Sequence, residues 1–109
     1  MLLQIIEQGL SLERGLLQVS GITVHYDPDA PVGERVRSAQ VGGVELDLQR
    51  SYRVATLEIL AQGGDAYEQF LGVEDMVLED AAYAAVLEAY FKQTDVVSIP
   101  PRGRLIPEP

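Results

Sequence analysis

Residues 52–67 read YRVATLEILAQGGDAY, and this stretch decides how the chain is interpreted. Its first part has the β-branched and apolar composition of a buried strand. Gly63 and Gly64 then predict a tight turn, because glycine adopts backbone angles closed to other residues and lets a ligand approach the main chain. The turn presents the carboxylate of Asp65, which suits hydrogen bonding to sugar hydroxyls. The same carboxylate is also well placed to cap a following helix, so both interpretations stand at this point.

The rest of the chain predicts strands and helices in mixed order. Apolar alternation and turn residues predict strands at Leu16–Ser20, Ile22–Tyr26, Glu34–Val41, a hairpin partner from Val44, Tyr52–Leu57, and Gly103–Ile106. Helical patterns are expected for an N-terminal helix that ends at Gly9, for Ala66–Leu71 and for Leu78–Gln93. The expected fold class is therefore α+β, with a mixed or antiparallel sheet packed against helices.

Composition restricts the partners. The 109 residues are enough for one domain, and 17 acidic against 8 basic residues give a net charge of −9. This charge opposes binding to nucleic acid polymers and to anionic membranes, although placed arginines can still hold a free nucleotide. Without cysteine the chain has no thiol nucleophile and no zinc–thiolate site, and no apolar run approaches the ~20 residues of a membrane span.

The chain lacks a recognisable catalytic or metal-binding set of residues. Its single histidine, His25, is expected on the polar face of a strand. A two-metal hydrolytic site needs several histidines and carboxylates that converge, which one histidine cannot supply. Asp27 and Asp29 resemble the start of a calcium loop, but Val32 stands where that loop needs glycine. We therefore expect no catalytic residue and no metal ligand in this chain.

An ordered series of motifs carries a resemblance to a known family. The segments are Leu16–Ile22, Tyr26-Asp27-Pro28, Pro31–Val36, Gly43–Asp47, Tyr52–Thr56 and Leu60–Asp65. Together they resemble the C-terminal domain of the 5'-nucleotidase family, which also contains UDP-sugar hydrolases and 2',3'-cyclic-nucleotide phosphodiesterases. The resemblance covers residues 2 to 106. It implies that residues 1–109 are part of a substrate-binding domain that lacks its first portion.

The resemblance also implies how function is divided. Family members carry two divalent metal ions on an N-terminal metallophosphatase domain, which is absent here, so this chain is expected to be inactive alone and to hold no cofactor. Asp65 matches the aspartate that binds ribose, and Gly63 and Gly64 match its turn. Ile59 stands where the family usually has a phenylalanine that stacks on the base, so about 1–3 kcal/mol of stacking is lost. The implied partners are a nucleotide or nucleoside and the metallophosphatase domain, in the periplasm or outside the cell.

Two alternatives stay open. The thiosulfohydrolases of sulfur oxidation share the two-domain layout and need no base stacking, so Ile59 fits them as well. A non-enzymatic role is the other alternative, because a domain that begins partway leaves sheet edges uncovered, and these favour a homodimer.

Overall fold

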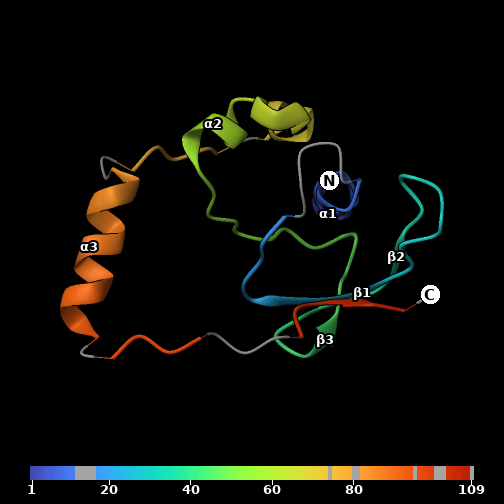
Figure 1. The fold of residues 1–109 in the computed structure, drawn as a ribbon. Coiled ribbons are helices and arrows are strands. Elements are labelled where there is room, and N and C mark those ends of the chain that lie inside the picture. The colour runs from blue at the N-terminus through green and yellow to red at the C-terminus, as the bar shows by residue number, and fades with distance from the viewer. Residues whose placement is uncertain (12–16, 74, 80–81, 95, 100–102, 109) are drawn as a thin grey trace.

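The structure is a computed structural model that describes residues 1–11, 17–73, 75–79, 82–94, 96–99 and 103–108. Along the chain the elements are α1 (Leu2–Gly9), β1 (Ile22–Tyr26), β2 (Val36–Val41), β3 (Val44–Glu45), α2 (Glu58–Ala61), the 3₁₀ turns η1 (Gly64–Ala66) and η2 (Glu68–Gly72), α3 (Tyr83–Gln93) and β4 (Leu105–Pro107). Figure 1 shows α1 and the short helices on one side of the sheet, with α3 standing apart.

The four strands form one mixed sheet in the order β3-β2-β1-β4. β1 and β2 are antiparallel, and β2 turns into β3 through Gly42 and Gly43, whose φ angles of 60° and 80° are those of a tight hairpin turn. β4 returns from the far end of the chain and pairs parallel to β1, with Val24 opposite Leu105. The mixed sheet and its helices confirm the α+β fold class.

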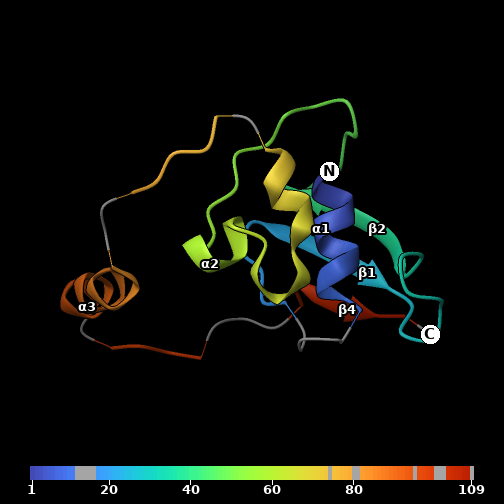
Figure 2. The same cartoon turned by 90° about the horizontal axis from the view of Figure 1, so that it is seen from above.

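The core forms where α1 crosses one face of the sheet (Figure 2). Ile6 and Leu10 from the helix side pack with Val24 and Ala39 from the two central strands, and all four are buried. The neighbouring side of α1 places Ile5 against a second buried cluster, which contains Tyr67 and Phe70 from the segment after the glycine turn. A single amphipathic helix therefore joins the sheet to the segment that carries Asp65.

The buried strand expected at Tyr52–Leu57 is wrong. These residues are extended and largely exposed, and none of them pairs with a strand of the described sheet. A local turn at Asp47 redirects the chain before them: its Oδ1 accepts the Gln49 N–H at 2.9 Å, and its own N–H donates to the Tyr52 hydroxyl at 2.9 Å. The side chain of Tyr52 thus stabilises a turn, and the segment that follows it joins neither edge of the described sheet.

Several other boundaries differ from the prediction. The Ala66–Leu71 helix is wrong, because Asp65 and Ala66 have φ angles of 52° and 65° and the chain forms two 3₁₀ turns instead. Leu78 and Glu79 are not helical, so the described helix begins only at Tyr83, after residues 80 and 81, which lie outside the described part.

The strand predictions also need correction. Residues 17–19 of the expected Leu16–Ser20 strand form no strand, and residue 16 lies outside the described residues. β2 begins at Val36 rather than at Glu34, and β4 ends one residue beyond the prediction, at Pro107. The N-terminal helix, the strand at Ile22–Tyr26 and the hairpin into Val44 are confirmed.

Candidate functional site

The double glycine after α2 forms the turn that the sequence predicts. Gly63 has a φ of 86°, in the left-handed region that favours glycine. A Cβ atom at Gly64 would lie 2.4 Å from the carbonyl oxygen of Ile59, so only glycine lets the chain pack this closely on the end of α2. The turn and Ile59 are thereby held together by main-chain packing.

Asp65 follows with an exposed side chain and a left-handed backbone. No described residue hydrogen-bonds to its carboxylate. The residues that begin the two 3₁₀ turns are Gly63 and Tyr67, and neither turn has a side-chain cap. The capping interpretation of Asp65 is therefore wrong. Within the described part of the chain, its carboxylate has no hydrogen-bond partner.

Tyr67, two residues further on, is a core side chain. It is 6% exposed, packs with Ile5, and its ring centroid lies 6.2 Å from that of Phe70. Burial raises the pKa of the Tyr67 hydroxyl, and the negative charge of Asp65 adds to this increase. The carboxylate of Asp65 is therefore close enough to Tyr67 for its charge to affect the pKa of the Tyr67 hydroxyl.

Ile59 supplies the apolar part of the candidate site. It lies on α2, is 64% exposed, and touches the turn through Gly64. The structure thus brings together the four residues that the sequence singles out: Ile59, Gly63, Gly64 and Asp65. Of these, Ile59 and Asp65 are exposed, and Gly63 and Gly64 are half-buried.

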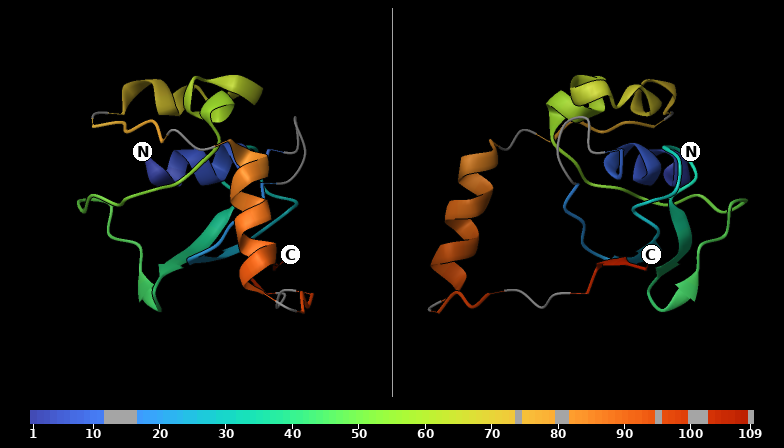
Figure 3. Two further views of the ribbon diagram at one scale, coloured as in Figure 1. Left: turned by 90° about the vertical axis from the view of Figure 1, so that its left-hand side faces the viewer. Right: turned by 45° about the vertical axis from the view of Figure 1, so that its right-hand side comes forward.

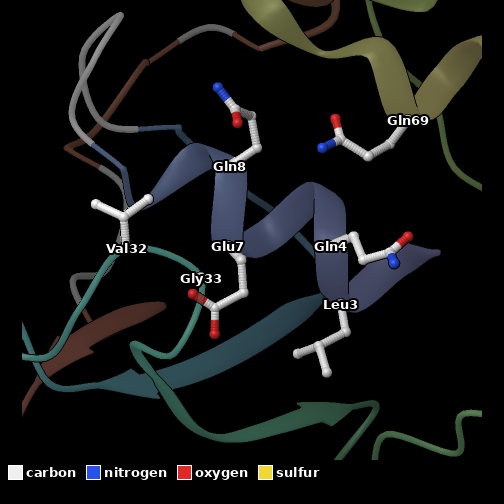
Figure 4. Close-up of a pocket in the computed structure, with 7 residues that line it drawn as sticks. All are labelled: Leu3, Gln4, Glu7, Gln8, Val32, Gly33 and Gln69. Carbon is white, nitrogen blue, oxygen red and sulfur yellow. The ribbon is translucent and has the colours of Figure 1, made fainter.

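A shallow cavity of about 280 Å³ lies elsewhere, where α1 meets the loop before β2 (Figure 4). It is lined by Leu3, Gln4, Glu7, Gln8, Val32, Gly33 and Gln69. Its walls come from three separate segments without a motif, so the sequence alone does not predict it. Each carboxylate oxygen of Glu7 accepts a main-chain hydrogen bond, one from the Arg35 N–H and one from the Val36 N–H, so this side chain helps to hold β2 against α1.

Several polar side chains on and beside the sheet also have hydrogen-bond or ion-pair partners. His25 Nδ1 lies 2.6 Å from a carboxylate oxygen of Glu108, and Arg37 pairs with Asp27. Arg35 donates from its guanidinium to the carbonyl oxygens of Ala30 and Leu10. Among the described residues, no group of three or more histidines and carboxylates could hold a metal ion.

The fold and the turn define a class of domain, an α+β module that presents one carboxylate on a double-glycine turn. The sequence model of the family described as "5'-nucleotidase, C-terminal domain" matches residues 1–72. The chain therefore belongs to this family, and the resemblance drawn from its motifs is confirmed.

Similar proteins agree with this assignment. The chain is 32% identical over 98 residues to a snake venom 5'-nucleotidase from Macrovipera lebetinus, covering 83% of this chain and 24% of the relative. It is 31% identical over 99 residues to a snake venom 5'-nucleotidase from Naja atra, covering 84% of this chain and 19% of the relative. An apyrase from Tabanus yao is 28% identical over 100 residues, which covers 84% of this chain and 18% of the relative.

The chain therefore spans only about a fifth of the length of these relatives. None of the helices within the described ranges is both long and apolar enough to cross a membrane.

Proposed function

We propose that this chain is the nucleoside-recognising part of a 5'-nucleotidase-like phosphoester hydrolase, and that the Gly63–Asp65 turn binds the ribose. One observation carries the proposal: the Asp65 carboxylate is exposed, caps no helix and has no hydrogen-bond partner among the described residues. A carboxylate accepts hydrogen bonds through both oxygens, so it can bind two neighbouring hydroxyls of a sugar at once.

The surroundings of Asp65 fit a flat, polar ligand with one apolar edge. Gly63 and Gly64 carry no side chain, so a sugar can approach their main chain closely. Ile59 offers an aliphatic contact to a base, without the ring face that supports stacking. We therefore expect weak binding of a nucleoside to this chain alone.

Phosphoester hydrolysis would occur outside this chain. In the proposed enzyme, an N-terminal metallophosphatase domain would hold two divalent metal ions that supply an activated water, and the present chain would position the nucleotide for that reaction. The pure chain is expected to release no phosphate from AMP in the presence of divalent metal ions. Two of the relatives are named as venom proteins, which supports an extracellular location for the whole protein.

A thiosulfohydrolase-like relative is the second candidate, and exposed Ile59 is the observation that favours it. Such an enzyme binds no base, so it requires no aromatic ring at this position. The names of the relatives, two 5'-nucleotidases and an apyrase, favour the nucleotide. A full-length parent that hydrolyses a thiosulfonate-type substrate and leaves AMP intact would decide for the second candidate.

An amide NMR titration with adenosine, AMP and UDP-glucose tests the proposed site. Saturable shifts are expected at Gly63, Gly64 and Asp65, and they should disappear in Asp65→Ala. Asp75→Ala is the matched control, because Asp75 is also an exposed carboxylate with a positive φ, of 55°. A well-dispersed spectrum that none of the three ligands changes would contradict ribose binding by this turn.

A further inference from the structure

The negative charge of the chain is concentrated in one part of the sequence. Residues 54–91 contain eight of the 17 acidic residues and none of the eight basic ones. This acidic segment therefore carries a charge of −8, whereas the remaining 71 residues together carry only −1. The turn of Gly63, Gly64 and Asp65 lies within the acidic segment, so a ligand of this turn meets a negative potential.

Two further carboxylates belong to the elements before and after the turn. Glu58 begins α2 and Glu68 begins η2. Both side chains are exposed, as is that of Asp65. Besides burial, which has the larger effect, the charge of Asp65 raises the pKa of the Tyr67 hydroxyl, so charge at this turn acts on neighbouring groups. An anionic ligand group at the turn is subject to the same field.

Aliphatic side chains lie against both glycines of the turn. A Cβ atom at Gly64 would lie 2.8 Å from the side chain of Ile59, and one at Gly63 would lie 3.3 Å from that of Leu71. Ile59 and Leu71 are 64% and 65% exposed. They can contact the carbon atoms of a sugar or a base, but they donate no hydrogen bond to a phosphate.

Most described basic side chains have partners away from the turn. Three arginines lie on or beside the sheet, where each has a hydrogen-bond or ion-pair partner: Arg35, Arg37 and Arg104. In Figure 3, α1 lies between the sheet and the group formed by α2 and the 3₁₀ turns. Lys92 is on α3 and pairs with Glu88 at 3.0 Å. These four cations are therefore not placed to offset the charge of a phosphate at the turn.

Two arginines precede α2. The guanidinium of Arg50 lies over the ring of Tyr52, 5.4 Å from its centroid. Arg53 is exposed and is the basic residue nearest to Asp65 in the sequence. Arg53 is therefore the cation whose contribution the experiment has to separate.

The ligand that this surface favours is uncharged. A phosphomonoester carries about −1.5 to −2 charges at pH 7. When Asp65 binds the hydroxyls of ribose, the phosphate on the same sugar lies within the Debye length of ~10 Å in 0.1 M salt, so its repulsion by the carboxylates is only partly screened. We propose that the Gly63–Asp65 turn binds a nucleoside more tightly than the corresponding 5'-nucleotide.

This inference rests on the proposed function and adds a property to it. The chain prefers the dephosphorylated product of the proposed reaction to its substrate. Accumulated nucleoside then competes with the nucleotide for the turn, so the product inhibits the whole enzyme through this chain.

Binding of adenosine, AMP and ADP to the pure chain tests the proposal. Amide NMR titrations followed at Gly63, Gly64 and Asp65 give a dissociation constant for each ligand, with a chelator present so that no divalent ion bridges phosphate and carboxylate. At low salt we expect AMP to bind about three- to tenfold more weakly than adenosine, and ADP more weakly still. In 1 M NaCl, where the Debye length is about 3 Å, this difference should nearly disappear.

Charge substitutions assign the difference to the carboxylates beside the turn. The double variant Glu58→Gln/Glu68→Gln retains the shape of both side chains and should bring the constants for adenosine and AMP closer together. Glu34→Gln/Glu45→Gln is the matched control, because it removes two exposed carboxylates on the sheet side of the molecule and should retain the difference. The same difference in both double variants would overturn the role of Glu58 and Glu68.

The remaining outcomes separate this inference from the proposed function. AMP that binds as tightly as adenosine, or more tightly, would overturn the inference, and loss of both ligands in Asp65→Ala would still support ribose binding. If Arg53→Gln then weakens AMP alone, Arg53 supplies a phosphate contact. Failure of all three ligands to shift the amides of the turn would overturn the proposed function, and this inference with it.

Discussion

The carboxylate of Glu7 on α1 accepts a hydrogen bond from the backbone N–H of Arg35, at 3.0 Å, at the entry to β2. Its other oxygen accepts the N–H of Val36 at 2.8 Å, and Arg35 returns a bond from its guanidinium to the carbonyl oxygen of Leu10. The end of α1 and the start of β2 are thus joined by reciprocal bonds between side chain and main chain. This connection fixes the helix over the sheet.

Removal of the Glu7 carboxylate is expected to destabilise the fold. In Glu7→Ala the N–H groups of Arg35 and Val36 lose their acceptors, and bonds to a charged group contribute about 1.5–3 kcal/mol each, so we expect a loss of about 2–4 kcal/mol. Urea unfolding followed by circular dichroism measures the change. Glu34→Ala, an exposed glutamate next to the same strand, should change the stability by no more than about 0.5 kcal/mol. Equal effects of the two substitutions would contradict the connection.

Backbone strain at Ala66 predicts a stabilising substitution. Its φ of 65° places a Cβ atom in the left-handed region, where non-glycine residues cost about 1–2 kcal/mol. After the entropy cost of glycine, Ala66→Gly should raise the free energy of unfolding by about 0.5–1 kcal/mol. The same substitution at buried Ala39 in β2 should lower it, so thermal melts of the pair are expected to shift in opposite directions.

Asp27 predicts how stability responds to acid. The Asp29 N–H, which donates to its carboxylate at 2.9 Å, and the Arg37 guanidinium lower the pKa of Asp27 below its ordinary value. Since the folded pKa is below the unfolded value of about 3.9, the stabilisation is fully present above that pH and is lost as the pH falls through the folded pKa. Unfolding midpoints of wild type and Asp27→Asn should therefore converge in acid. A constant difference from neutral to acidic pH would refute this assignment.

Tyr67 gives a test of the candidate site that needs no ligand. Burial raises the pKa of its hydroxyl first, and the charge of Asp65 raises it further. In Asp65→Asn the pKa of Tyr67 should fall but stay above the ordinary value of about 10, because burial remains. Carbon-13 NMR of the Tyr67 ring carbon that bears the hydroxyl, followed through an alkaline titration, measures this shift.

At high pH, the stability of the fold depends on the ionisation of the same Tyr67 hydroxyl. A tyrosine whose folded pKa is raised contributes stability that is fully present below its unfolded pKa and is lost as the pH rises through the folded value. Tyr67→Phe should therefore flatten the alkaline decline in stability. Tyr52→Phe, at a half-buried tyrosine outside this cluster, is the comparison for this measurement.

The features that sequence analysis predicts correctly are those fixed by local chemistry. The alternation of Ile22–Tyr26 and the glycines at 42 and 43 specify a strand and a turn whatever surrounds them. The Gly63–Asp65 turn follows the same rule. The prediction of a strand at Tyr52–Leu57 is wrong because apolar and β-branched residues only permit a strand. A strand also needs a neighbouring strand with which it can pair.

The role of Arg35 could not be predicted for a related reason. Its partners, the carbonyl oxygens of Ala30 and Leu10, are main-chain groups that any residue carries. No residue type at either position signals the bond in the sequence. The cavity beside Glu7 escapes prediction in the same way, since it arises from the placement of separate segments.

The parallel pairing of β4 with β1 sets an order of events during synthesis. Leu105, the neighbour of Val24 in the sheet, is the 81st residue to be added after it. Contacts between such distant residues form slowly, because a long loop must close before they contribute. The antiparallel hairpin of β2 and β3 can form on the nascent chain, but the β1 edge stays open until residue 107 has emerged. The edge of β1 is therefore unprotected while residues 27–107 are being added, and this is the interval in which chaperones or other nascent chains can reach it.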